Sequence, residues 1–260
     1  MTEEAPQTVQ VDFTLTVGDG RIDISTMVPL QRINLTQLLP VLQSIEHAII
    51  DDSVRQAEAE GRTVSCRAGC GACCRQLVPL SIFEAEALGD WIRTLPLARQ
   101  QELEQRFHRV LLGLRDAGML ERILSREWIA DEEVRDKMGA EYFRLGLPCP
   151  FLENESCSIH PIRPLSCREY LVTSPAELCA DPLRNQVAGI SLPLKLSRAL
   201  YRMGRELEAD TSGLIPLVFL FAWMKGGLRP GEAYIGSGPE LLYEVVRRLA
   251  TTPAPDLPAA

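Results

Sequence analysis

The chain has 260 residues, of which 27 are Lys or Arg and 35 are Asp or Glu, so its formal net charge is −8. This acidic balance argues against a nucleic-acid-binding protein, because phosphate backbones reward clustered Lys and Arg. A hydrophobic fraction of 46% and a charged fraction of 24% are those of an ordinary folded protein, which excludes extensive disorder.

The start of the chain lacks the pattern of an export signal, since residues 1–8 have neither a basic start nor an apolar stretch. The most apolar run, residues 214–224, contains Pro216 and is far shorter than the roughly 20 residues of a membrane-spanning helix. We therefore expect a cytoplasmic protein with no membrane contact, in which this run forms a buried core helix.

The first elements in chain order are a β-hairpin and a long helix. Apolar and polar residues alternate over 9–17 and again from Ile22, on either side of Gly18-Asp19-Gly20, which predicts a hairpin. A helical period of apolar residues follows, with Asn34 or Thr36 as N-cap and Gly61 as a stop. This pattern predicts a helix over residues 36–60.

Further helices are predicted on both sides of an irregular segment. Ser81 and Glu84 have capping-box spacing, which predicts a helix running to Thr94. Helical patterns continue over 97–145, with breaks at 113–118 and near Ser125, and they return at 192–207, 214–225 and 240–249. Residues 148–182 contain six prolines and little periodicity, so neither helices nor central strands are expected there.

The eight cysteines are the most informative feature of the sequence. In a chain expected to lie in a reducing cytoplasm, they favour metal binding over a disulfide framework. They fall into two groups, one within a short loop and one spread over the proline-rich segment, and all eight are candidate metal ligands: Cys66, Cys70, Cys73 and Cys74, then Cys149, Cys157, Cys167 and Cys179.

The spacing of the first group is C-x3-C-x2-C-C. Side chains three and four positions apart lie on one side of a helical turn, so Cys66, Cys70 and either Cys73 or Cys74 can converge on one point. Gly69 and Gly71 leave space where the backbone approaches an ion or cluster. Ligands from the second group would complete the coordination and hold the irregular segment in place.

Neighbouring residues leave several interpretations open. Arg67, Arg75, Arg163 and Arg168 lie close to cysteines in sequence, and they either stabilise a negatively charged thiolate centre or form ordinary ion pairs. Cys149, Cys157 and Cys179 could instead be small buried apolar side chains. His160, between Cys157 and Cys167, is expected to be structural and not a ligand.

These motifs resemble the YkgJ-like cysteine-cluster family of zinc- or iron-chelating domains. The matching pieces are the C-x3-C-x2-C-C run, Cys149-Pro150-Phe151-Leu152, the Cys157 to Arg163-Pro164 stretch, and Cys167-Arg168 with Tyr170. They span roughly residues 64–182, and Cys179 resembles a late cysteine of some members. The resemblance implies a bound metal. It also implies an alternative function, because some members are named flagellin lysine N-methylases.

Both zinc and a [4Fe–4S] cluster take four thiolates. We favour iron–sulfur, because a compact cysteine run with a distant cysteine is common in cluster ligation. The main prediction is a metal-binding protein whose centre is structural, electron-carrying or sensory, with the metal or cluster as its partner and neither nucleic acid nor membrane among its partners.

Three other functions are weaker alternatives. A protein lysine N-methyltransferase using S-adenosylmethionine, with a protein substrate, rests on the resemblance alone, since no strand precedes a Gly-rich turn and helix. A radical S-adenosylmethionine enzyme shares the cysteine spacing, but Ala72 stands where such enzymes usually have an aromatic residue. Dithiol redox chemistry at Cys73-Cys74 lacks a thioredoxin-like context.

The predicted fold is mainly α, with a small N-terminal β-hairpin and an irregular Cys- and Pro-rich metal-binding centre. We divide the chain into the hairpin and long helix (1–62), a cysteine-cluster domain with a helical insert (63–182), C-terminal helices packing on the same core (183–250), and a disordered tail (251–260). Oligomeric state and any reaction are not determined by these patterns.

Overall fold

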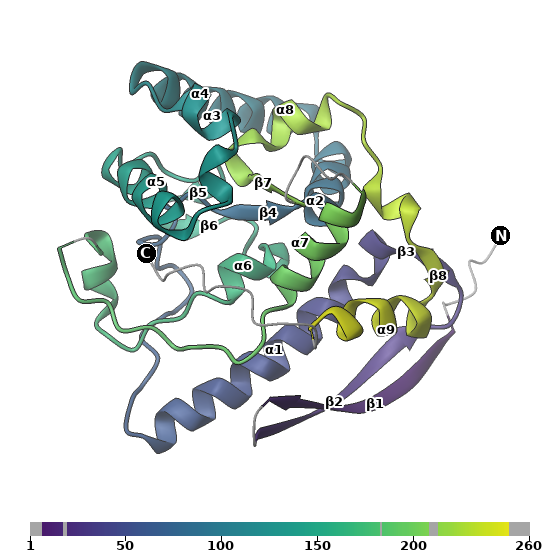
Figure 1. Ribbon diagram of the computed structural model, residues 1–260. Helices are drawn as coiled ribbons and strands as arrows, with labels where there is room; N and C mark the ends of the chain where they lie inside the picture. The colour runs from purple at the N-terminus through teal and green to yellow at the C-terminus, as the bar shows by residue number, and fades with distance from the viewer. Residues whose placement is uncertain (1–6, 18–19, 183, 208–212, 250–260) are drawn as a thin grey trace.

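The computed structural model describes residues 7–17, 20–182, 184–207 and 213–249, and its architecture is mainly helical with a β-hairpin at the N-terminal end (Figure 1). The predicted fold class is therefore confirmed. The turn predicted at residues 18–20 lies partly outside the described residues, and the tail predicted to be disordered lies wholly outside them.

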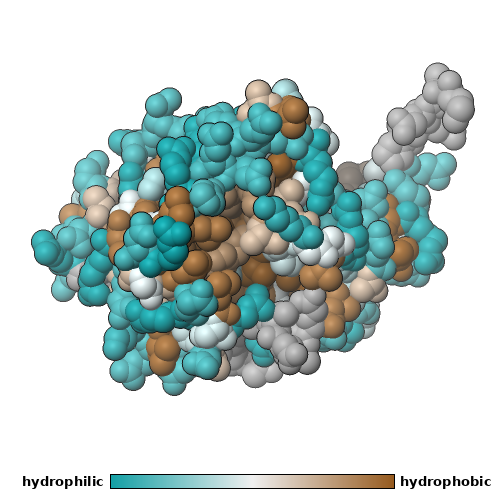
Figure 2. Space-filling model, turned by 90° about the horizontal axis from the view of Figure 1, so that it is seen from above, coloured by the Kyte–Doolittle hydropathy of each residue, from teal (hydrophilic) through white to brown (hydrophobic). Residues whose placement is uncertain are grey.

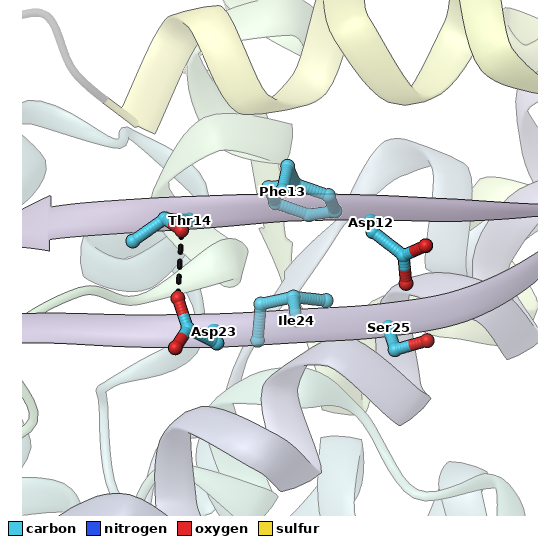
Figure 3. A pocket seen from close by; sticks show the side chains of 6 residues that line it. All are labelled: Asp12, Phe13, Thr14, Asp23, Ile24 and Ser25. Carbon is cyan, nitrogen blue, oxygen red and sulfur yellow. Dashed lines mark hydrogen bonds between the residues drawn. The ribbon is translucent and has the colours of Figure 1, made fainter.

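The hairpin consists of β1 (Thr8–Val17) and β2 (Gly20–Pro29), paired antiparallel with Phe13 opposite Ile24. One face carries the apolar residues and packs on the helices, whereas the other carries polar side chains such as Asp12, Thr14 and Asp23. Figure 3 shows a shallow surface hollow at this point, where Thr14 donates a hydrogen bond to Asp23 across the strands at 2.7 Å. The alternation in the sequence thus produced a two-faced sheet.

Helix α1 (Leu35–Ala59) lies across the hairpin and α9 (Figure 1). Asn34 is its N-cap, and its side chain accepts from the Gln37 amide while the Gln37 side chain accepts from the Asn34 amide. The helix ends where Gly61 adopts a φ of +78°, which an L side chain disfavours. The predicted helix is confirmed within one residue at each end.

Helix α2 (Ile82–Thr94) follows the short strand β4 (Pro79–Ser81) and begins with the predicted capping box between Ser81 and Glu84. Strand β4 pairs with β7 (Leu214–Pro216), far away in sequence. Residues 214–224 therefore form a strand, the 3₁₀ turn η4 (Leu217–Phe219) and the short helix α8 (Leu220–Met224). The prediction of one helix here was wrong, because residues 214–216 pair with β4 as a strand and Pro216 disfavours a continuous helix.

The predicted helical stretch after α2 contains α3 (Leu97–Asp116), α4 (Leu120–Leu124), the 3₁₀ turn η1 (Glu127–Ile129) and α5 (Glu132–Arg144), with breaks close to those expected. These elements enclose a second, smaller apolar cluster, which Val218 and Phe219 join from the C-terminal part of the chain.

The proline-rich segment contains only short elements, as predicted. They are the two-residue strands β5 (Leu152–Glu153) and β6 (Ser156–Cys157), the turns η2 (His160–Ile162) and η3 (Ala176–Ala180), and the one-turn helix α6 (Leu165–Arg168). Asn154 and Glu155 have φ values of 49° and 57° between the two strands, as a tight two-residue hairpin requires.

The C-terminal part contains α7 (Leu196–Leu207), η5 (Pro230–Ala233), β8 (Ile235–Ser237) and α9 (Gly238–Leu249). Strand β8 pairs with β3 (Arg32–Asn34), just before α1. Helix α7 begins later, and α9 earlier, than the apolar period indicated. The short strands β3 to β8 were not predicted, because two or three residues carry no alternation that a sequence pattern can show.

One large apolar core contains residues from the hairpin, from α1, α2, α3 and α7, and from α9. No described helix combines the length and the hydropathy that a membrane crossing needs. On the face that lies at the top of Figure 1, hydrophilic side chains surround a central group of hydrophobic ones (Figure 2). The irregular segment with its cysteines lies at one side of this core.

Candidate metal centre

The first cysteine loop is held at its N-terminal end by residues 172–174. The Ser65 amide donates to the Val172 carbonyl at 2.9 Å, and the Ser65 hydroxyl donates to the Ser174 carbonyl at 2.5 Å. The Val172 amide in turn donates to the Cys66 sulfur at 3.3 Å. Cys66 is therefore fixed against the part of the irregular segment that leads to Cys179.

The other end of the loop is held by residues 149–155. The Cys149 amide donates to the Cys74 carbonyl at 2.7 Å, and Arg75 pairs with Glu155 through two hydrogen bonds of 2.7 and 3.0 Å. A Cβ at Gly71 would lie 2.7 Å from the Leu152 side chain and 2.9 Å from the Glu155 carbonyl oxygen. The loop thus packs tightly against the β5–β6 hairpin.

The two loop glycines have different roles. Gly71 lets the β5–β6 hairpin approach, whereas Gly69 has a φ of +84° and an added Cβ there would meet nothing within 4 Å. From the sequence, both glycines were expected to leave space for the approach of an ion or cluster. The structure gives Gly71 a packing role and Gly69 a conformational one.

Cys66 is partly buried and Cys179 is buried. Burial raises the pKa of Cys66, and the charges of Cys73 and Cys70 raise it further. Burial raises the pKa of Cys179 to about 11, again with contributions from Cys66, Cys73 and Cys70. Charge interactions of this kind decline with distance.

Cys149, Cys157 and Cys167 come from the proline-rich segment, and all three are partly buried. Burial raises the pKa of Cys149 to about 12, with Cys157 and Cys73 adding to the effect. Burial raises the pKa of Cys167 well above its usual range, and Cys149, Cys73 and Cys157 contribute in that order. Cys149 and Cys157 also pack against the large apolar core, which agrees in part with their interpretation as buried apolar side chains.

The charge of Cys73 contributes to the raised pKa of four other thiols, those of Cys66, Cys149, Cys167 and Cys179. A hydrogen bond with the Cys74 side chain is the largest cause that raises the pKa of Cys73 itself. All eight cysteines are free thiols. Within the described residues, no group of three or more His, Cys, Asp or Glu side chains is arranged to hold a metal ion.

The donor set nevertheless fits a thiophilic metal. Thiols with raised pKa values stay protonated at neutral pH until a positive charge stabilises the thiolate, and a metal ion supplies that charge while releasing the proton. Hydrogen bonds bring the first cysteine loop against Cys149 and residues 172–174 of the proline-rich segment, although the two segments lie far apart in the chain. Which of them are ligands stays a prediction.

The four arginines near the cysteines behave differently. Arg75 pairs with Glu155, and Arg168 donates to the carbonyl oxygens of Arg163 and Pro161. Burial or hydrogen bonding raises the pKa of four thiols, and the positive charge of the Arg163 guanidinium lowers it in each of them. These thiols are Cys66, Cys73, Cys157 and Cys167. Its buried Nε has no hydrogen-bond partner. Arg163 is therefore the arginine placed to stabilise thiolates, while Arg67 is exposed.

His160 is exposed at the start of η2, and desolvation with the charges of Arg163 and Arg168 lowers its pKa. That His160 is structural and not a metal ligand stays a prediction.

Three buried glutamates hold the starts of α6 and α7, and of these only Glu84 was singled out from the sequence. Glu84 accepts from the Leu165 amide at 2.7 Å and thereby fixes the start of α6, which carries Cys167. Glu169 accepts from the amide and hydroxyl of Ser197, and Glu46 accepts from the Leu196 amide, so both bind the N-terminus of α7. The sequence contains one indication of the role of Glu46, since its carboxylate falls on the apolar face of a predicted helix and would need a buried partner.

The fold and these thiols define a mainly helical protein with a cysteine-rich, metal-binding region. Residues 65–183 match the family model CxxCxxCC, described as "Putative zinc- or iron-chelating domain". This part of the chain belongs to that cysteine-cluster family, as the motifs predict. The comparison with curated proteins gives no match, and neither does the comparison with solved structures.

Proposed function

We propose that the cysteine-rich region binds iron as a [4Fe–4S] cluster in preference to zinc, in a structural, electron-transfer or sensory role. The observation that supports metal binding most directly is the joining of two remote cysteine segments by backbone hydrogen bonds, Ser65 to Val172 and Cys149 to Cys74. Thiols from both segments are brought within electrostatic reach of Cys73.

The cysteine side chains would hold the metal, and the remaining residues would prepare them. Burial disfavours a thiolate whose negative charge is not balanced. A metal cation balances that charge, so metal binding replaces the thiol protons. The Val172 amide donates a hydrogen bond to the Cys66 sulfur, and the positive charge of Arg163 lowers the pKa of Cys167. Such contacts stabilise thiolate ligands and tune a metal centre.

Iron–sulfur is favoured over zinc on chemical grounds. Four thiolates suit either metal, but N–H donors to ligand sulfurs and partial burial are among the factors that set cluster potentials. Cys66 accepts such an N–H bond and remains partly exposed. A bound [4Fe–4S] cluster would supply one-electron redox chemistry.

Anaerobic purification of the full chain, followed by metal analysis, acid-labile sulfide analysis and a visible spectrum, tests the proposal. We expect iron and sulfide in equal amounts and a broad visible absorption. Zinc without iron or sulfide would refute the cluster but keep the metal site, and protein without bound metal would refute both. Cys157→Ser should lower the amount of bound metal. Ser156→Ala, a substitution at the exposed neighbouring residue, is its control and should leave the metal content unchanged.

A further inference from the structure

We propose that strand β1 pairs with β1 of a second copy of this chain, so that two hairpins form one four-stranded antiparallel sheet and the protein is a dimer. The pairing uses the edge of β1 that faces away from β2. This inference is independent of the proposed metal binding, because the hairpin precedes the cysteine-rich region and contains no candidate ligand.

The outer edge of β1 is long and uninterrupted. Its ten residues pair with β2 in one continuous register, and among the described residues β2 is the only strand with which it pairs. Helices α1 and α9 contact β2, so β1 is the outer strand of the hairpin. Proteins usually protect such an edge with Lys, Pro or a bulge, but β1 contains neither Lys nor Pro, and its only charged residue is Asp12. An edge of this kind is suited to receive another strand.

The hydrogen bonds of the hairpin identify the backbone groups that point to this edge. The Leu30 amide donates to the Gln7 carbonyl at 2.9 Å, one position beyond the pair formed by Thr8 and Pro29. Hydrogen-bonded and non-hydrogen-bonded positions alternate in an antiparallel pair, so the odd-numbered residues of β1 bond to β2. Pro29, which has no amide hydrogen, accordingly lies opposite the even-numbered Thr8. The backbone groups at the outer edge are therefore those of the even-numbered residues between 8 and 16.

Apolar side chains along β1 are incompletely covered. Val9, Val11 and Phe13 lie on the core side of the hairpin but are only half-buried. The β2 residues opposite Val9 and Phe13, which are Val28 and Ile24, are buried. A second β1 strand would cover more of the exposed apolar surface, and burial of such surface favours association.

Charge selects the register and makes β1 complementary to itself. When a two-fold axis relates two antiparallel copies of a strand, the residue at the axis lies opposite its own copy. The two axis positions that overlap the strands most fully are Asp12 and Phe13. An axis at Asp12 would place two carboxylates opposite each other, which is unfavourable. An axis at Phe13 places Asp12 opposite Thr14 and Gln10 opposite Thr16, so no like charges meet and the outward-pointing backbone groups bond to one another.

Other segments of the same chain are poorer occupants of this edge. Residues 1–6 lead directly into β1, and residues 250–260 contain Pro253, Pro255 and Pro258. Proline has no N–H group to donate to a strand ladder. A second copy is therefore the occupant that the sequence and the register favour.

Sedimentation velocity and amide hydrogen exchange by NMR, each over a range of concentrations of the full chain, test the proposal. We expect a concentration-dependent dimer in which the amides of the even-numbered residues 10–16 become protected, whereas those of the odd-numbered residues 9–15 are protected at every concentration. A protein that stays monomeric would overturn the proposal, and so would a dimer whose even-numbered amides exchange as in the monomer. Protection of these amides in the monomer would show that the chain covers its own edge, which also overturns the proposal.

Charge variants test the register. Gln10→Lys with Thr16→Lys places lysines opposite each other twice across the axis and should raise the dimer dissociation constant about tenfold, whereas Gln10→Lys with Thr16→Glu should not raise it. Gln101→Lys with Gln105→Lys, two lysines on the exposed side of α3, is the control and should leave the constant unchanged. Equal constants for the two hairpin variants would contradict this pairing. Circular dichroism verifies folding, and the wild-type measurements decide the proposal even if a variant fails to fold.

Discussion

The amide nitrogen of Cys149 donates a 2.7 Å hydrogen bond to the carbonyl oxygen of Cys74. This bond joins the end of the first cysteine loop to the start of the second cysteine segment, although helices α2 to α5 lie between them in the chain. The protein scaffold therefore holds the two thiol-bearing segments together by backbone contacts. A bound metal would strengthen a proximity that folding has already established.

Substitution of Gly71 by alanine should loosen this contact. The new Cβ would lie within 3 Å of the Leu152 side chain and of the Glu155 carbonyl oxygen, so the hairpin must shift, at a cost of about 1–3 kcal/mol. We expect a lower Tm and weaker metal binding, measured by thermal unfolding and chelator competition. Gly69→Ala, where only the positive φ is disfavoured, should cost about 1 kcal/mol. Equal effects of the two variants would argue against the packing role of Gly71.

Arg163→Gln should weaken metal binding about 10- to 100-fold, the usual effect of removing a group that supports metal ligands. The reason is the loss of a positive charge that favours the thiolate forms of Cys66 and Cys167. Arg163→Lys should retain much of the affinity, and the exposed Arg67→Gln should leave it unchanged. The measurements are the metal affinity and, for protein loaded with Co²⁺, the energy of the sulfur-to-cobalt charge-transfer band. An unaltered affinity and band in Arg163→Gln would contradict this role.

Glu84→Gln should make Cys167 more accessible. The buried carboxylate accepts from Ser81 and from the Leu165 amide at the start of α6, and a glutamine can keep only part of this set, costing about 1–3 kcal/mol. We expect faster alkylation of Cys167, measured by mass spectrometry of peptides from the metal-free protein. Glu102→Gln, on the exposed side of α3, is the control. Unchanged alkylation at Cys167 would show that α6 is held by other contacts.

Stability should depend on pH through Glu169. Burial raises the pKa of this carboxyl from 4.5 to about 7, against the hydrogen bonds from Ser197. The folded state therefore holds the proton more tightly than the unfolded state. The resulting stabilisation is complete below about pH 4.5 and is lost as the pH rises to about 7.

The measurement compares wild type with Glu169→Gln by urea unfolding of metal-free protein. Between pH 4.5 and 7, the free energy of unfolding of wild type should fall by about 2–3 kcal/mol relative to the variant. A constant difference across this range would mean that the carboxyl titrates normally. Glu46 shifts in the same direction through burial and the Glu169 charge, so the two carboxyls titrate as a pair.

Local patterns in the sequence predicted much of the fold. The hairpin alternation, the Asn34 cap and the Ser81–Glu84 capping box each act within a few residues, and the structure confirms them. The apolar run at 214–224 shows the limit of such patterns, because β7 pairs with β4 across most of the chain. That pairing depends on the whole fold, so no pattern in the neighbouring residues could predict it.

The sequence by itself indicated the family that the cysteine-rich part of the chain resembles and the eight candidate ligands, because cysteine spacing is a short-range pattern. Only the tertiary structure decided that the first cysteine loop is bonded to Cys149 and Val172, and that Glu46, Glu84 and Glu169 hold α6 and α7. These relationships join residues far apart in the chain. They exist only after burial of the common apolar core has brought α1, α2 and the irregular segment together.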